Sequence, residues 1–289
     1  MSGVVVTGAS GQLAQQLKAL GVERRGWRFF SREEWNVVSY DDGRRVVEAL
    51  RPSVVVNCAA YTAVDRAEQE PDAAYRANAM GPQMLRRVSD ALGVRILHIS
   101  TDYVAGDGRA APLREVDTVA PRGVYALSKR AGEEALLDSP RAIVLRTGWL
   151  YSTYGKNFFL TMARRALEGV DSSVVNDQVG CPTWAGFLAG VIVEIAKREE
   201  WRAGLYHCSN AGVASWYDFA CAIYRALGGN GCVAPIPSAE YPQQASRPAF
   251  SVLDCRKIGL IYGVKIPHWQ DSLMACAEEF RRGGATIKM

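Results

Sequence analysis

Apolar and polar positions follow two alternating patterns through the first half of the chain. Short runs rich in β-branched, aliphatic or aromatic residues predict strands at 4–7, 27–30, 54–58, 95–100 and 142–146. Between them, apolar residues recur every three to four positions and predict helices at 15–20, 41–50, 73–92 and 125–137. Nearly continuous apolar strands are typical of parallel sheets covered on both faces. The alternation therefore predicts an α/β protein of Rossmann type, with right-handed βαβ units doubly wound around a parallel sheet.

The second half of the chain is less regular. Pro and Gly interrupt it at 180–183, 228–231 and 235–248. Helices are still expected at 183–197 and 215–227. The second of these opens with a Ser-x-x-Asp arrangement, Ser215 and Asp218, which is typical of a helix N-cap.

A glycine-rich turn joins the first expected strand to the first expected helix. Gly8 permits the tight turn, Gly11 lets the backbone approach a pyrophosphate, and small Ala14 lets the helix lie close to the strand. Free N–H groups at the start of the helix would then face the anion. The spacing is Gly-x-x-Gly-x-x-Ala, one residue longer than the common dinucleotide fingerprint. Its position favours a dinucleotide site over the alternative, a glycine-rich turn without a ligand.

The turn suggests a role for each half of the chain. We expect residues 1–150 to form a dinucleotide-binding domain, with some segments within 183–210 returning to it. Residues 151–289 would form mainly a smaller C-terminal substrate-binding lobe. In open α/β sheets, ligands bind beyond the carboxyl ends of the strands. The later lobe would therefore close over that edge.

Residues just after the second expected strand bear on the choice of cofactor. Sites for NAD usually have an acidic residue here, about twenty positions after the turn, which accepts from the ribose 2′-hydroxyl. This chain has Ser31 and Arg32 instead, which favours a 2′-phosphate and hence NADPH, with NADH as the alternative. Glu33 and Glu34 follow directly, so a shift of two residues would reverse the inference.

Tyr125 and Lys129 are four residues apart within an expected helix, so their side chains share one face. A phenol beside a fixed ammonium is suited to give a proton to a carbonyl oxygen, because the cation lowers the normally high pKa of the phenol. An exposed pair on a solvated helix would have the same spacing. The pair is therefore a candidate catalytic site only in combination with the phosphate-binding turn.

Composition narrows the range of functions. The chain has 289 residues and a net charge of +4, from 34 basic and 30 acidic residues that are interleaved. This pattern does not indicate nucleic-acid binding. The seven cysteines form no Cys-x-x-Cys pair and the three histidines are far apart, so we expect neither a disulfide framework nor a metal site. Neither a run of about 18 apolar residues nor a leader-like N-terminus is present, so we expect a cytoplasmic protein without a membrane partner.

Together with the turn and the Tyr-Lys pair, several longer strings resemble the extended short-chain dehydrogenase/reductase family. Within it, the chain is most similar to the branch that reduces 4-keto sugars carried on nucleotides. The strings span nearly the whole chain, at 56–65, 100–104, 125–133, 146–151, 176–183 and 245–248. Gly123 and Ala126 depart from the family pattern, which often has Asn and Gly at these positions, and would loosen the geometry beside Tyr125.

The resemblance implies a role for each matching position. The residues implied to contact the dinucleotide, besides the two after the second strand, are Gly8, Gly11, Gln12, Leu13, Ala59, Ala60, Tyr61, Tyr125 and Lys129. Those implied to contact the sugar are Thr101, Asp102 and Trp149. Thr101 would hydrogen-bond the sugar carbonyl oxygen, Tyr125 would protonate it, and Lys129 would hold the nicotinamide ribose while lowering the pKa of the phenol. We add Arg247 as a partner for the nucleotide diphosphate, because a guanidinium fork fits phosphate oxygens.

The implied activity is the NAD(P)H-dependent reduction of the C4 keto group of a nucleotide-linked 6-deoxy-4-keto sugar, by a monomer or a homodimer. Two other functions fit the same fold. The chain also resembles the β subunit of methionine adenosyltransferase, a non-catalytic regulatory subunit that binds NADP. A nucleotide-sugar epimerase would instead hold NAD tightly and show no net consumption of it. Trp149 and the string at 176–183 favour a sugar pocket.

Overall fold

A computed structural model describes residues 3–105 and 111–283 of the chain. These residues contain a six-stranded sheet in the order β10-β5-β4-β3-β1-β2, in which every neighbouring pair is parallel. The strands are β1 (Val4–Thr7), β2 (Trp27–Phe30), β3 (Val54–Asn57), β4 (Arg95–Thr101), β5 (Ala142–Thr147) and β10 (Gly204–His207). The predicted α/β fold with a parallel central sheet is confirmed.

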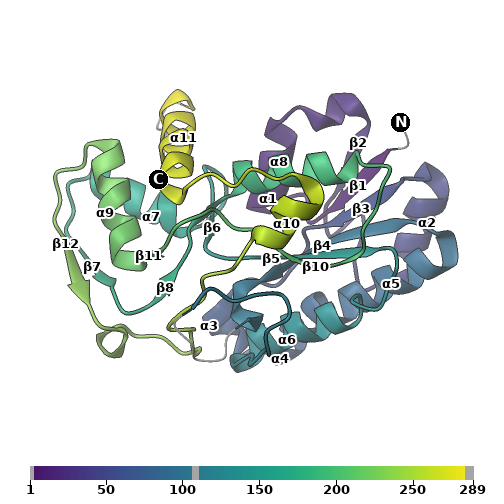
Figure 1. Ribbon diagram of the computed structural model, residues 1–289, viewed down its shortest axis with the longest axis horizontal. Coiled ribbons are helices and arrows are strands. Elements are labelled where there is room, and N and C mark those ends of the chain that lie inside the picture. The colour runs from purple at the N-terminus through teal and green to yellow at the C-terminus, as the bar shows by residue number, and fades with distance from the viewer. Residues whose placement is uncertain (1–2, 106–110, 284–289) are drawn as a thin grey trace.

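Helices cover both faces of this sheet (Figure 1). One layer holds α1 (Gln12–Ala19), α8 (Ala185–Ala196) and α10 (Arg256–Tyr262), and the other holds α2 (Tyr40–Leu50), α5 (Gly81–Leu92) and α6 (Gly123–Glu134). Val4 and Val6 of β1 belong to the apolar core under the first layer, and Val5 to the core under the second. Because both layers are apolar, every residue of β1, β3 and β5 is buried.

The order of the strands reverses at β1, since β2 lies on one side of it and β3 on the other. In open α/β sheets, a crevice forms at such a reversal, beyond the carboxyl ends of the strands. The segments that follow β1, β3, β4 and β5 therefore meet at one edge of the sheet.

The stretch predicted as one helix at 73–92 is divided into α4 (Pro71–Tyr75), a π-helical turn η2 (Arg76–Met80) and α5. Pro82 has no N–H, and its ring crowds the carbonyl of Asn78, four residues earlier. That carbonyl approaches α6, where a Cβ at Gly132 would collide with the Asn78 oxygen. The π turn is therefore found where Pro82 and Gly132 come together, and these two residues are neighbours only in the folded chain.

The second half of the chain builds a smaller lobe beside the sheet (Figure 1). Its helices are α7 (Phe158–Leu167), α9 (Trp216–Leu227) and α11 (Trp269–Arg282). Its short strands pair as β6 (Leu150–Tyr151) with β9 (Thr183–Trp184), β7 (Ser172–Val175) with β12 (Val233–Ile236), and β8 (Val179–Gly180) with β11 (Ala214–Ser215). The N-cap predicted for α9 is confirmed, because the Ser215 hydroxyl accepts from the Asp218 N–H at 3.0 Å.

The segment from α8 to β10 leaves this lobe and joins the first half of the chain. Helix α8 packs against α1, and β10 pairs with β5 at the edge of the sheet. The short helix α3 (Val64–Ala67) and the turn η3 (Asp102–Val104) both pack against α6. Among the described residues, no helix is long and apolar enough to cross a membrane.

Candidate active site

The glycine-rich turn runs from the end of β1 into the start of α1. Gly8 has φ +72°, and a Cβ at this position would lie 2.7 Å from the backbone nitrogen of Ala59. A side chain is excluded there by both the backbone conformation and the neighbouring strand. Gly11 is the N-cap of α1 and offers no side chain to the first N–H groups of the helix. These N–H groups remain available to an anion.

Two cavities, of about 530 and 590 Å³, lie along the carboxyl ends of the strands within the described residues. They share Ser10, Gly11, Cys58 and Ala60, so we treat them as one cleft with a first and a second cavity. Predicted residues that line the first cavity are Gly8, Gly11, Arg32, Ala59, Ala60 and Tyr61. Those that line the second are Gly11, Gln12, Leu13, Ala60, Thr101, Asp102, Tyr125, Lys129 and Trp149. Residues predicted for the dinucleotide thus line both cavities, and the sugar residues line the second.

An asparagine that the sequence did not single out holds the loop after β3. The Asn78 side chain accepts from the Tyr61 N–H at 2.9 Å and donates to the Tyr61 carbonyl at 3.0 Å. It also donates to the Ser128 hydroxyl at 3.1 Å, on α6. The Tyr61 hydroxyl donates to Glu70 at 2.8 Å. The π turn that carries Asn78 therefore fixes one wall of the first cavity.

Thr101 and Asp102 lie at the end of β4 and are both buried. The Thr101 hydroxyl donates to one Asp102 carboxylate oxygen at 3.2 Å and accepts from the Tyr103 N–H at 3.3 Å. The second oxygen of Asp102 has no hydrogen-bond partner among the described residues. Burial raises the pKa of Asp102 to about 6. The wall of the second cavity therefore contains a buried carboxyl group whose pKa lies close to neutral pH.

Tyr125 and Lys129 lie on α6 and line the second cavity together with Thr101. The Lys129 ammonium is 2% exposed and donates to the carbonyl of Ile99 at 2.7 Å. The Tyr125 ring meets the Tyr103 ring edge to face, with centroids 5.4 Å apart. The predicted pair is thus held inside the cavity by β4 and the turn after it, and is not an exposed pair on a helix surface.

The pKa values of this pair differ from the prediction. Burial raises the pKa of Tyr125 to about 12, and the hydrogen bond with Thr101 acts in the opposite direction. Burial lowers the pKa of Lys129 to about 8. The expectation that the pKa of Tyr125 is lowered is therefore wrong for the net shift, because desolvation of the phenol is the largest effect on it.

A buried ion pair lies one helical turn beyond Lys129. The Glu133 carboxylate accepts from Arg146 at 2.7 and 2.8 Å and from the Ser100 hydroxyl at 2.6 Å. Both charged side chains are almost completely buried. Glu133 also raises the pKa of Lys129, against the effect of burial. This network connects α6 to β4 and β5 beneath the site.

The start of α6 is tightly packed, contrary to the looser geometry expected from Gly123 and Ala126. Gly123 has φ +77°, and a Cβ there would lie 2.6 Å from a Glu68 carboxylate oxygen. The same oxygen accepts from the Val124 N–H at 2.8 Å. Ala126 is fully buried. Glycine is therefore the residue that this backbone conformation and its neighbouring carboxylate require.

Two tryptophans form one wall of the second cavity. The rings of Trp149 and Trp216 are stacked, with centroids 3.5 Å apart and planes at 1°. Trp149 has φ +48°, a left-handed conformation that costs a non-glycine residue about 1–2 kcal/mol. Strained residues of this kind cluster at functional sites. Trp216 comes from the second lobe, so the stacked pair brings that lobe into the cavity wall.

Arg247 does not line either cavity. Its guanidinium donates to the Asp65 carboxylate at 2.6 Å. Asp65 also accepts from the N–H groups of Gln244 and Ala245, at 3.1 and 3.0 Å. In this structure Arg247 therefore connects the segment 243–247 to α3, and its expected contact with the diphosphate of the nucleotide sugar stays a prediction.

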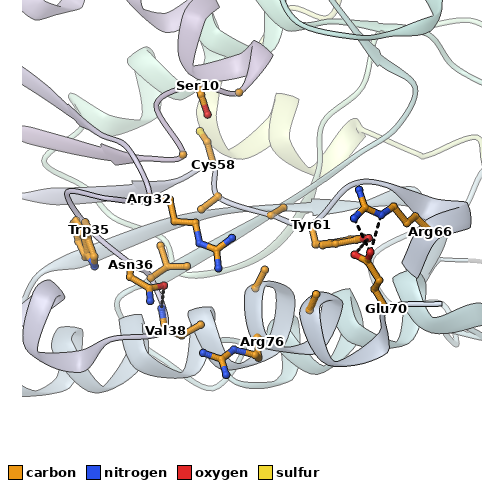
Figure 2. A pocket seen from close by; sticks show the side chains of 17 residues that line it. Ser10, Arg32, Trp35, Asn36, Val38, Cys58, Tyr61, Arg66, Glu70 and Arg76 are labelled. Carbon is orange, nitrogen blue, oxygen red and sulfur yellow. Dashed lines mark hydrogen bonds and ion pairs between the residues drawn. The ribbon is translucent and has the colours of Figure 1, made fainter. Parts of the chain in front are cut away.

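The two residues predicted to select the cofactor are separated. Arg32 lines the first cavity, where Figure 2 shows its side chain extended into the cleft. Ser31 is not among the lining residues. Its N–H donates to the Glu34 carboxylate at 2.8 Å. Ser31 therefore orders the turn after β2 and does not face the cleft.

Two residues of the cleft were not singled out from the sequence. Trp216 reaches the second cavity through tertiary packing, and Thr147 lies beside Thr101 because β4 and β5 are paired in that register. The Thr147 hydroxyl is buried in the second cavity without a hydrogen-bond partner among the described residues. No group of three or more His, Cys, Asp or Glu side chains in the described part of the chain is placed to hold a metal ion.

Comparison with known proteins agrees with this geometry. A family model described as the RmlD substrate binding domain matches residues 1–282. The chain is 37% identical over 286 residues to dTDP-4-dehydrorhamnose reductase of Aggregatibacter actinomycetemcomitans, covering 94% of this chain and 97% of that protein. It is also 37% identical to dTDP-4-dehydrorhamnose reductase of Sinorhizobium fredii, covering 93% of this chain and 94% of that protein.

The fold is equally close to solved structures. It matches the crystal structure of dTDP-4-dehydrorhamnose reductase from Bacillus anthracis in complex with NADP, with a TM-score of 0.90 and 33% identity, over 96% of this chain and 99% of that one. The resemblance predicted from the sequence strings is confirmed. The chain therefore belongs to the RmlD substrate binding domain family.

Proposed function

We propose that this chain is an NADPH-dependent reductase of the C4 keto group of a dTDP-linked 6-deoxy-4-keto sugar, as in the conversion of dTDP-4-dehydrorhamnose to dTDP-rhamnose. One observation carries the proposal: Thr101, Tyr125 and Lys129 line the same cavity as the start of α1. The names of its relatives and the NADP in the Bacillus anthracis structure support it.

The residues of the cleft fit a dinucleotide. The space left by Gly8 and the free N–H groups of α1 suit a pyrophosphate, and the cleft continues from there to Tyr125 and Lys129. Bound NADPH would supply the hydride for C4 of the sugar. The protein supplies the binding groups, the orientation and the proton.

Tyr125 is the proton donor of the proposed reaction. With a pKa of about 12, its phenol is fully protonated at neutral pH. Thr101 offers a second hydroxyl to the same oxygen as negative charge develops there. Lys129, with a pKa of about 8, is mainly an ammonium at neutral pH and stabilises the phenol oxygen as the proton leaves. A positioned general acid contributes about 10²–10⁴ in rate.

Asp102 and the stacked tryptophans form the proposed contacts to the sugar. The Asp102 carboxylate, which lines the second cavity, accepts a hydrogen bond from a sugar hydroxyl. Trp149 and Trp216 provide a flat apolar wall that suits the face of a sugar ring and excludes water. Oligomeric state, as a monomer or a homodimer, and cytoplasmic location stay predictions.

Oxidation of NADPH by the purified protein tests the proposal. We expect absorbance loss with a dTDP-linked 4-keto-6-deoxy sugar, and a product with a new C4 hydroxyl by NMR. Tyr125→Phe is the control for the assigned donor. No consumption, together with tight binding to a methionine adenosyltransferase catalytic subunit, would instead support a regulatory subunit. Tightly held NAD without net consumption would support an epimerase.

A further inference from the structure

The first cavity carries an excess of positive charge. Among the residues that line it are three arginines, Arg32, Arg66 and Arg76, and one acid, Glu70. Glu70 already accepts from Arg66 at 2.7 Å and from the Tyr61 hydroxyl at 2.8 Å, as the dashed lines in Figure 2 show. Within the described residues, neither Arg32 nor Arg76 forms an ion pair. Two unpaired guanidinium groups therefore remain in this cavity.

The acidic residues next to Arg32 do not cancel this charge. Glu34 accepts from the Ser31 N–H at 2.8 Å, and its own carbonyl accepts from Arg45 at 3.1 Å. Hydrogen bonds from its own backbone and from Ser31 hold the pKa of Glu33 below its usual range, and the charge of Arg32 adds a smaller effect in the same direction. Neither glutamate lines the cavity. In the turn after β2, both glutamates therefore hydrogen-bond with Ser31, whereas Arg32 lines the cleft.

Arg76 comes from the opposite wall of the cavity. It is the first residue of the π turn η2, two positions before Asn78. Since Asn78 is fixed by its two hydrogen bonds to Tyr61, the start of the turn is fixed relative to the cleft. Figure 2 shows Arg32 extending toward this helical wall and Arg76 lying along it. The two arginines therefore face the same space from the turn after β2 and from η2.

We propose that Arg32 and Arg76 together form a binding site for a phosphate monoester on the 2′ position of an adenosine ribose. The inference rests on the proposed function for the use of NADPH, and it adds Arg76 as a second residue that selects the phosphorylated cofactor. Two guanidinium forks match the double negative charge and the several oxygens of such a phosphate. An NADH ribose would leave both arginines without this partner.

Isothermal titration of the full chain with adenosine 2′,5′-bisphosphate and with 5′-AMP tests the proposal without turnover. We expect Arg76→Ala to weaken binding of the bisphosphate by about ten-fold, the effect of losing one hydrogen bond to a charged group. The same variant should change 5′-AMP binding by less than about two-fold. Arg32→Ala should behave likewise, and Arg76→Lys should retain part of the affinity.

Arg24→Ala is the matched control, because it removes one exposed positive charge that does not line either cavity. Bisphosphate binding unchanged in Arg76→Ala, or weakened equally in Arg24→Ala, would overturn the inference, as would an equal loss of 5′-AMP binding. Thermal melting of each variant shows whether it is folded. If the wild-type protein prefers the bisphosphate but reduces no keto sugar, the proposed function fails and the phosphate site stands.

Discussion

Asp102→Asn should make the protein more stable at neutral pH and less active. The Asp102 carboxyl is 2% exposed, and its pKa is raised from 3.8 to about 6 by burial. Each pKa unit corresponds to about 1.4 kcal/mol, so the ionised form is disfavoured in the folded protein by about 3 kcal/mol. The folded-state pKa of Asp102 lies above the unfolded-state value. The contribution of this carboxyl group to the free energy of unfolding is therefore present at low pH and is lost as the pH rises through about 6.

Asparagine has nearly the same shape and does not ionise, so the variant lacks this pH dependence. We expect its free energy of unfolding, relative to the wild-type protein, to grow by about 2 kcal/mol between about pH 4 and about pH 7. Urea unfolding at a series of pH values measures the difference, in which titration of the other carboxyl groups cancels. A difference that stays constant over this range would refute the reasoning. In kinetics, the wild-type kcat/KM should fall below about pH 6 as Asp102 is protonated, and the variant should lose this limb.

Three other variants or conditions test separate parts of the site. Tyr125→Phe should reduce kcat by at least about 10²-fold while NADPH binding, measured by fluorescence, is retained; near-normal turnover would contradict its role as donor. The kcat/KM of the wild-type protein should also fall above about pH 8, where Lys129 loses its proton, and a flat profile there would exclude the ammonium from the mechanism. Gly8→Ala should abolish measurable NADPH binding in a folded protein, because the new Cβ would lie 2.7 Å from Ala59 N; unchanged binding would mean that the turn does not hold the cofactor.

Local sequence features predicted the parts of the site that depend on backbone geometry. The turn at Gly8 and Gly11 is recognisable because a tight strand-to-helix connection needs glycine at fixed positions. Tyr125 and Lys129 are recognisable because helical spacing places them on one face. In each case, the information lies within a few residues of the chain. The parallel sheet was predicted for the same reason, since each buried strand is apolar by itself.

Features that arise between distant segments were not predicted. The π turn depends on Pro82 and on the approach of Asn78 to Gly132, which lies 54 positions further along the chain. The stacking of Trp216 on Trp149 requires the second lobe to be in place. The direction of the Tyr125 pKa shift was wrong because spacing reveals a neighbouring charge but not the degree of desolvation. Burial is a property of the whole fold, and here it has the largest effect on the pKa of Tyr125.

Gln12 shows how one position serves both lobes. Its side chain donates to the Leu150 carbonyl at 3.1 Å and accepts from Ser152 and Asn157, at 3.1 and 3.3 Å. Asn157 in turn caps α7 by accepting from the Leu160 N–H at 3.1 Å. These partners occupy the side-chain amide of Gln12, so only backbone N–H groups in the first turn of α1 remain to bind an anion. The Gln12 side chain instead joins the glycine-rich turn to the second lobe. The glycine-rich turn and the second lobe are thereby held together by the same hydrogen bonds, which explains why Gln12 has its side-chain partners about 140 positions away.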